Sequence, residues 1–410
     1  MAKKPPPLPL RHAFWFGWKL VIALSVFLCV LAFLRLRSQS EPSLTLARRS
    51  RFFRPRSFEG PPKIAFLFLA RQNLPLDFIW GTFFQNADAA NFSLYIHSVP
   101  GFVFNKSTSR SHFFYGRQLS NSIKVEWGES SMIEAERLLF EAALDDPANQ
   151  RFVLLSDSCV PLYTFSYVYN HLMASPRSFV DSFIDVNGDR YNPKMSPIIP
   201  KGKWRKGSQK LGYVNQVKER TCFVTWVPVE DIPCLCNQIN HNLHQFRSDA
   251  EVVVDDGIIF PVFQKFCKRR PPIDHSKGIL NIELQKQHNC IPDEHYVQTL
   301  LSMSGLEGEL ERRTLTYTVW NESAPNMEGK GWHPVTFNYA NANPKQIKEI
   351  KDINHVYYKN EFRTEWCRAG SASVPCFLFA RKFSKGAAMR LLSQGVAGPF
   401  NASALLDAPL

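Results

Sequence analysis

The order of apolar and polar positions predicts an alternation of strands and helices in the N-terminal half of the chain. Short apolar runs predict strands, at residues 64–70, 92–98, 123–125 and 152–155. Apolar residues at helical spacing predict two helices between them, at residues 76–86 and 132–144. Strands and helices in alternation are typical of an α/β domain with a mainly parallel sheet.

Ligands of such sheets usually bind beyond the carboxyl ends of the strands. Three polar residues stand at or just after predicted strands and are therefore candidates for the site: Arg71, His97 and Asp157. For any one of them taken alone, an ordinary loop residue is the better interpretation.

A long apolar segment precedes this domain. Residues 20–34 carry no charge, and aromatic residues extend the segment back to Ala13, with Lys19 near one end. A membrane-spanning helix needs roughly 17–25 residues, so we expect a signal anchor at 13–34, a cytosolic tail at 1–12 and a stalk at 35–62. The alternative is a signal peptide cleaved near residues 38–40, which Arg35 and Arg37 disfavour.

The net charge of +13 is concentrated at the N-terminus. Residues 1–56 hold eleven Lys and Arg against one acid, Glu41, so only three net charges remain for the rest of the chain. A basic body that binds nucleic acid is therefore not expected. A hydrophobic content of 45% with 33 Phe also excludes disorder for most of the chain.

Sequons and cysteines suggest that the body lies on the lumenal side. Four Asn-x-Ser tripeptides are candidate glycosylation sites, at Asn91, Asn105, Asn321 and Asn401. Cys29 falls in the predicted anchor, and eight cysteines follow it. A lumenal compartment permits disulfides, and Cys367 with Cys376 are placed to close a short loop, but the full pairing stays open.

Three segments combine residues that bear chemistry: Lys203-Trp204-Arg205-Lys206-Gly207-Ser208-Gln209, the run from Cys290 to Tyr296, and the run from Cys376 to Phe383. These blocks resemble the core-2/I-branching β-1,6-N-acetylglucosaminyltransferase family, especially its plant branch. Residues 155–162 and Asp189-Arg190-Tyr191-Asn192-Pro193 are similar to further family segments. The resemblance covers roughly residues 60–400, and we expect the transferase domain at 63–400 with a tail at 401–410.

The resemblance implies a Golgi type II membrane enzyme with a GT-A-like, Rossmann-type fold. It implies transfer of a sugar from a UDP-sugar to a glycan acceptor with inversion at the anomeric carbon. It also implies that no metal or other cofactor is needed, since the family lacks the Asp-x-Asp metal motif. This chain has Ser156-Asp157-Ser158 in that neighbourhood.

The residues themselves suggest how such a reaction runs. A base must deprotonate the acceptor hydroxyl, and Glu294, in the segment that matches the family's catalytic loop, is the candidate. Positive charge must stabilise the departing diphosphate, and Arg381 and Lys382 stand at the family's matching basic position. Without the resemblance, a surface glutamate and a solvated basic strand end are the commoner interpretations.

Donor binding is further expected from Arg71, His97 and Asp157. Cationic and aromatic residues are the candidates for the acceptor side: Arg190, Trp204, Arg205, Lys206, Trp320 and Trp332. Aromatic faces stack on sugar rings, but a buried core tryptophan is an equally good interpretation of each Trp.

Residues 210–247 depart from the family pattern as an atypical insertion. They are either a real loop or a retained intron or mis-joined exon. Within them, Cys234, Cys236, His241 and His244 have a spacing that fits no standard zinc finger. Residues 268–289 are also longer than the family pattern, so activity of this chain is left open.

The sequence therefore predicts a Golgi transferase of N-acetylglucosamine. Two alternatives are a glucuronosyltransferase acting on galactan chains, and an inactive glycan-binding protein. The expected partners are a UDP-sugar, a glycan acceptor and the membrane, with no nucleic acid.

Overall fold

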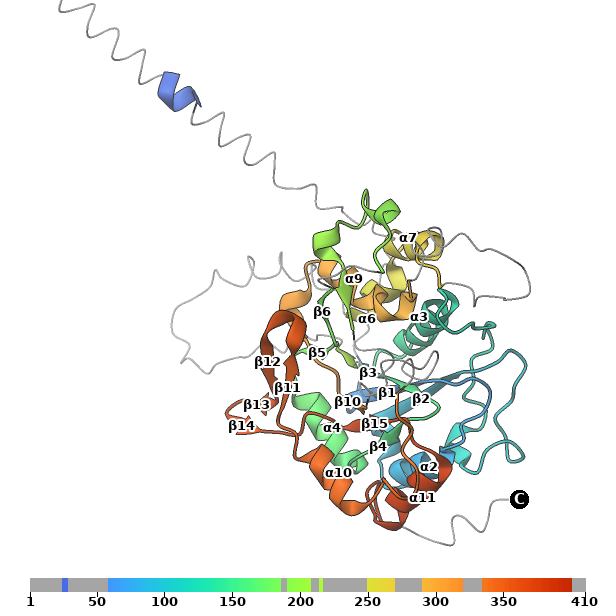
Figure 1. Cartoon of the computed structure of the whole chain (residues 1–410). Coiled ribbons are helices and arrows are strands. Elements are labelled where there is room, and N and C mark those ends of the chain that lie inside the picture. The colour runs from blue at the N-terminus through green and yellow to red at the C-terminus, as the bar shows by residue number, and fades with distance from the viewer. Residues whose placement is uncertain are drawn as a thin grey trace, which may run out of the picture. The chain divides into compact units, whose positions relative to one another are not determined.

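The computed structural model describes residues 24–28, 58–185, 190–207, 249–269, 290–319 and 334–399, and the backbone of residues 214–216 (Figure 1). The chain forms two compact units, residues 1–50 and residues 51–410. Residues 24–28 are helical and exposed, while the rest of the predicted anchor at 13–34 lies outside the described residues. Among the described helices, none is both long enough and apolar enough to cross a bilayer.

A six-stranded sheet forms the centre of the second unit, in the order β2-β1-β3-β8-β5-β9. Its strands are β1 (Lys63–Leu69), β2 (Phe92–His97), β3 (Asn149–Ser156), β5 (Ser178–Phe179), β8 (Val214–Gln216) and β9 (Leu310–Glu311). β1 pairs in parallel with β2 and β3, whereas β8 is antiparallel to both β3 and β5. The apolar run of β1 is buried on both faces, as is typical of a central parallel strand.

A second sheet brings the C-terminal part of the chain to the central one. β15 (Phe379–Arg381) lies between β10 (Thr316–Thr318) and β4 (Val160–Pro161), parallel to the first and antiparallel to the second. Because β4 begins shortly after β3 ends, this pairing places the end of β15 beside the end of β3. Three two-stranded pairs complete the described strands: β6 (Phe183–Ile184) with β7 (Arg205–Lys206), β11 (His355–Tyr358) with β12 (Arg363–Trp366), and β13 (Arg368–Ala369) with β14 (Ala372–Ser373).

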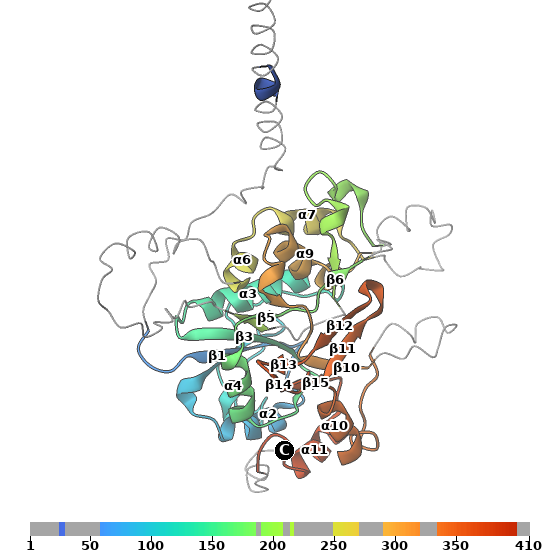
Figure 2. The same ribbon diagram turned by 90° about the vertical axis from the view of Figure 1, so that its left-hand side faces the viewer.

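Helices cover both faces of the central sheet (Figures 1 and 2). One group packs with Phe66 and Phe68 of β1: α2 (Asp77–Gln85), α4 (Phe165–Ala174), α10 (Pro344–Lys351) and α11 (Lys385–Ser393). The other group packs with Ala65 and Leu67: α3 (Ser131–Leu144), α6 (Asp249–Asp255), α7 (Ile259–Phe266) and α9 (Tyr296–Met303). Alternate residues of one strand thus enter two separate cores, as the period of a strand requires.

The predicted α/β class with a parallel sheet is confirmed, and five of the six predicted elements occur within one to three residues of their expected bounds. The strand predicted at 123–125 is wrong. The edge of β2 is already occupied, because Ile96 N donates to Arg117 O at 3.0 Å and Leu119 N donates to Ile96 O at 2.8 Å. The backbone at Ile123 instead donates to a side chain, Nε2 of His97, at 3.0 Å.

Candidate functional site

The carboxyl ends of β1, β3 and β15 bring three predicted site residues together. Arg71 follows β1 and Asp157 follows β3, and Nε of Arg71 donates to Oδ2 of Asp157 at 2.9 Å. The Arg71 side chain is 89% exposed, whereas that of Asp157 is 11% exposed. An ion pair with so exposed a cation contributes little to stability.

Arg381 ends β15 and is almost entirely buried. Burial lowers the pKa of Arg381, and the negative charges of Asp157 and Asp293 oppose that change. The pKa of Lys382 is also lowered, first by burial and then by the charges of Arg381 and Arg71. The charges of Arg381 and Arg71 thus both act on Lys382. We call Arg71, Arg381 and Lys382 the cation cluster.

His97 lies at the end of β2 but is buried, with Nε2 accepting the hydrogen bond from Ile123. Burial lowers the pKa of His97 to about 4, so the imidazole is neutral near pH 7. In this structure it fastens the segment after β2 to the sheet. Its predicted contact with the donor stays a prediction.

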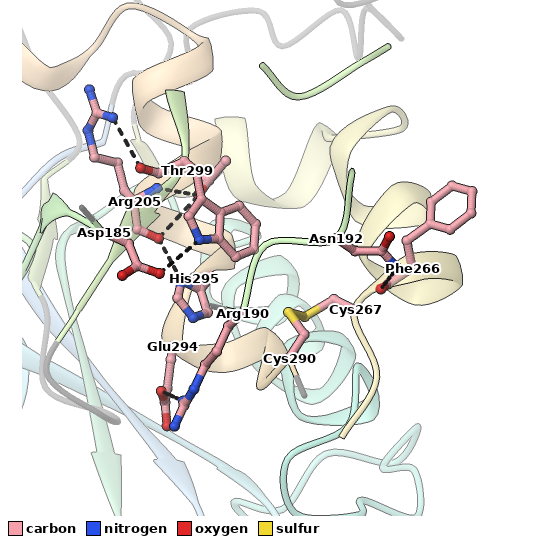
Figure 3. The surroundings of a disulfide bond; sticks show 11 residues. Asp185, Arg190, Asn192, Arg205, Phe266, Cys267, Cys290, Glu294, His295 and Thr299 are labelled. Atoms are coloured by element: carbon pink, nitrogen blue, oxygen red, sulfur yellow. Dashed lines mark hydrogen bonds and ion pairs between the residues drawn. A yellow bond between two sulfur atoms is a disulfide. The ribbon is translucent and has the colours of Figure 1, made fainter. Parts of the chain in front are cut away.

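Glu294 lies in a short 3₁₀ turn, Pro292–Glu294, directly before α9. Its side chain is completely buried and forms an ion pair between Oε2 and Nη1 of Arg190, as Figure 3 shows. Its backbone carbonyl accepts a hydrogen bond from Gly207 N at 2.9 Å. Two predicted site residues, 104 positions apart in the chain, are thereby brought into contact.

Gly207 allows this close approach because it has no side chain. A Cβ at this position would lie 2.2 Å from Nε2 of Gln298 and 2.7 Å from the backbone oxygen of Asp181. Both distances are far below van der Waals contact, so a larger residue would push the strand end away from Glu294. The glycine of the Lys203–Gln209 block therefore has a structural role at the site.

Trp204 packs beneath the Glu294 turn. Its ring stacks on His295, with centroids 4.4 Å apart, and on Phe263, with centroids 5.5 Å apart. Only 1% of Trp204 is exposed, and its Nε1 donates to Oδ2 of Asp185 at 3.3 Å. This matches the interpretation of a core tryptophan, and an acceptor contact by Trp204 stays a prediction.

His295 reinforces the same packing. Its Nδ1 donates to the backbone oxygen of Arg205 at 2.8 Å, and burial lowers its pKa to about 3. The ring is therefore neutral near pH 7, as its complete burial against Trp204 requires.

The remaining acceptor candidates differ in their surroundings. Arg205 is buried and makes a bidentate ion pair with Glu307, at 2.7 and 3.1 Å, which ties it to the protein rather than to solvent. Lys206 lies half-buried on β7. Trp320 and Trp332 lie outside the described residues, so their predicted role is not tested.

Two disulfides occur among the described residues. Cys367 pairs with Cys376, the short loop expected from the sequence, and Cys267 pairs with Cys290. The second bond joins the end of α7 to the segment that leads into the Glu294 turn (Figure 3). It also connects the residues on either side of 268–289.

The sequence pattern did not predict a buried network beneath the site. Arg137 donates to Tyr296 OH at 2.9 Å, and Tyr296 OH donates to Asp256 at 2.8 Å. Asp256 in turn accepts from three backbone N–H groups at the start of α7. The Asp-Gly pair at 256–257 followed by an apolar helix is a usable signal for such a cap.

The sequons and metal candidates are only partly described. Asn105 is exposed, in a turn where its Oδ1 accepts from Ser107 N at 2.8 Å, and Asn91 is half-buried before β2. Asn321, Asn401 and the cysteine and histidine residues of 234–244 lie outside the described residues. Among the residues described, no three His, Cys, Asp or Glu side chains are grouped to hold a metal ion. Metal independence stays a prediction.

Comparison with known proteins agrees with this arrangement. The sequence model of the Core-2/I-Branching enzyme family matches residues 64–212 and 246–351. The break between the two matched segments falls inside the predicted insertion at 210–247. The protein described as glycosyltransferase BC10, from Oryza sativa subsp. japonica, is 47% identical over 350 residues, which cover 84% of this chain and 80% of the relative. The chain therefore belongs to the core-2/I-branching enzyme family and is a glycosyltransferase.

Proposed function

We propose that this glycosyltransferase acts in the Golgi lumen and transfers N-acetylglucosamine from its UDP-sugar to a glycan hydroxyl, with inversion and without a metal ion. The observation that carries the proposal is a buried carboxylate, Glu294, held in an ion pair with Arg190, in a chain that also gathers cations at the strand ends. Asp293, the neighbour of Glu294, is one of the charges that act on Arg381. This coupling supports a single site that contains both the base and the cations.

In the proposed reaction, Glu294 accepts the proton of the acceptor hydroxyl as its oxygen attacks the anomeric carbon. The C–O bond to UDP breaks on the opposite side of the sugar, which inverts the anomeric centre. Arg190 orients the carboxylate through its ion pair. This contact fixes the direction in which the carboxylate faces an incoming hydroxyl.

The departing diphosphate gains negative charge, and the cation cluster is proposed to stabilise that charge. Arg381 is fixed at the end of a buried strand, so its charge is in place before the reaction begins. Fixed cations in a poorly solvated site stabilise such charge more than mobile surface groups do. Asp157 is already paired with Arg71, which supports cationic side chains in place of a metal ion.

A lumenal location is supported by the two disulfides and by the exposed sequon at Asn105. Disulfides persist in the secretory pathway and are rare in the cytosol. The apolar segment at 13–34 supports a membrane anchor on sequence grounds.

The test is donor profiling of the detergent-solubilised full-length protein. We expect hydrolysis or transfer with UDP-N-acetylglucosamine, unchanged by EDTA and abolished in Glu294→Gln. Preference for UDP-glucuronic acid would replace the donor assignment. Loss of activity in EDTA that Mn²⁺ restores would refute metal independence, and full activity of Glu294→Gln would refute the base.

A further inference from the structure

The β11–β12 hairpin presents two chemically different faces. Because the strands pair antiparallel with His355 opposite Trp366 and Tyr357 opposite Thr364, these four side chains share one face. All four are exposed. The residues between them alternate to the opposite face and are half-buried: Val356, Tyr358, Arg363 and Glu365.

The inward face and the turn of the hairpin fix it to the body of the enzyme. Tyr358 OH donates to Oδ1 of Asp181 at 2.5 Å, and Ile184 N donates to Oε1 of Glu361 at 2.7 Å. Arg363 donates to the backbone oxygen of Ser182 at 3.2 Å. The hairpin is thus held by several bonds to the single segment 181–184.

That segment leads directly to the candidate site. Phe183 and Ile184 form β6, which pairs with Arg205 and Lys206 of β7, and the backbone oxygen of Arg205 accepts the hydrogen bond from His295. Figure 2 shows the hairpin beside β6. A ligand held on the outward face would therefore be fixed in position relative to Glu294.

The outward face is rich in exposed aromatic surface. Tyr357 and Trp366 are 51% and 52% exposed, and the Trp366 ring lies 4.9 Å from that of His355. The guanidinium of Arg368 lies 5.6 Å from the Trp366 centroid. Soluble proteins seldom leave large aromatic groups together in water without a binding role.

The turn of the hairpin adds a further exposed ring. Phe362 is 87% exposed, and its φ of 50° places it in the left-handed region that bulky residues rarely adopt. Backbone conformations of this kind are concentrated at ligand-binding positions. Phe362 thus adopts an unfavourable backbone conformation, and its ring packs against almost nothing in the protein.

We propose that the outward face of the β11–β12 hairpin is an accessory glycan-binding surface. It binds a part of the acceptor chain that lies at a distance from the reacting hydroxyl. Sugar rings present flat C–H faces that pack on aromatic rings, and His355, Thr364 and Arg368 supply hydrogen bonds at the edges of those rings. The inference rests on the chain's being a glycosyltransferase, and on neither the donor nor the role of Glu294.

The test is affinity electrophoresis of the full-length protein in gels that contain arabinogalactan, xylan or hydroxyethylcellulose. We expect at least one polysaccharide to retard the wild type. Trp366→Ala and Tyr357→Ala should each raise the dissociation constant about tenfold. Tyr339→Ala is the matched control, because Tyr339 is 63% exposed beside α11 and stands apart from the hairpin.

Two further measurements separate this proposal from the proposed function. Glu294→Gln should keep full retardation, and the hairpin variants should bind UDP in calorimetry as the wild type does. No retardation of the wild type in any of the three gels would overturn the proposal, as would equal retardation of the hairpin variants. A dimer in sedimentation that the hairpin variants dissociate would assign the surface to a second copy of the chain and would also overturn it.

Discussion

Arg190 and Glu294 form an ion pair in which the carboxylate is fully buried and the guanidinium is 17% exposed. The pair joins the segment before the Lys203–Gln209 block to the turn before α9. A buried charge is costly unless it is paired, so each residue constrains where the other lies. This one contact links two of the sequence segments that suggested a transferase.

Glu294→Gln should reduce the rate of sugar transfer by about a thousandfold, because the amide cannot accept the acceptor's proton. UDP affinity, measured by calorimetry, should change less than about twofold, since Glu294 is not in the cation cluster. Glu307→Gln is the control, because Glu307 is also paired with an arginine, Arg205. An equal loss of activity in both variants would assign the effect of Glu294 to structure.

Arg190→Met should destabilise the fold by about 3 kcal/mol in urea unfolding, because it removes the cation that faces the buried Glu294 carboxylate. The double variant Arg190→Met with Glu294→Gln should recover much of that loss without recovering activity. Additive losses in the double variant would show that the two side chains do not interact.

Arg381→Ala should weaken UDP binding about tenfold to a hundredfold, because a fixed cation that faces the diphosphate is lost. Arg71→Ala should have a smaller effect, since its side chain is 89% exposed and its charge is screened by water. Calorimetric titration with UDP measures both. A larger loss with Arg71→Ala than with Arg381→Ala would contradict the proposed position of the diphosphate.

Stability should fall as the pH drops from about 6.5 towards 4. Burial lowers the pKa values of His97 and His171 to about 4 and that of His295 to about 3, against 6.5 in the unfolded chain. Below pH 6.5 the unfolded chain therefore binds more protons than the folded chain. At pH 5 this lowers the free energy of unfolding by at most about 2 kcal/mol per histidine. Urea unfolding between pH 7 and 5 measures the slope, and His97→Asn should flatten it.

Replacing Cys267 and Cys290 together by alanine should lower the free energy of unfolding by about 3 kcal/mol, from the loop entropy of a 23-residue separation. Removal of the disulfide between Cys367 and Cys376, which are separated by 9 residues, should lower the free energy of unfolding by less, because its loop is shorter. The first change should also lower the transfer rate, because Cys290 leads into the Glu294 turn. Unchanged activity with lowered stability would show that α9 alone positions Glu294.

The sequence predicted β1, β2 and β3 and the helices between them, because short apolar runs indicate buried strands and apolar residues at helical spacing indicate helices. It failed at 123–125, where the run resembles a strand but the edge of β2 already pairs with residues 117–119. Such competition for one sheet edge depends on loop geometry, which the apolar pattern does not contain.

The site was predictable only as a set of residues. Arg71, Asp157 and Arg381 could be placed at strand ends, but their convergence depends on β15 pairing with β4, a long-range contact. The packing of Trp204 between aromatic neighbours could not be predicted either. In the sequence, a tryptophan beside cations is compatible both with a surface that stacks on sugar rings and with a buried core position. The contact between Arg190 and Glu294 had no local signal at all.

The pairing of β15 with β4 has a consequence during protein synthesis. Arg381 leaves the ribosome long after Asp157 and Arg71, because it stands far later in the chain. The cation cluster of the nascent chain is therefore incomplete until β15 has been translated. Any truncation before residue 379 removes Arg381 together with the strand that carries it, and with them part of the proposed diphosphate site.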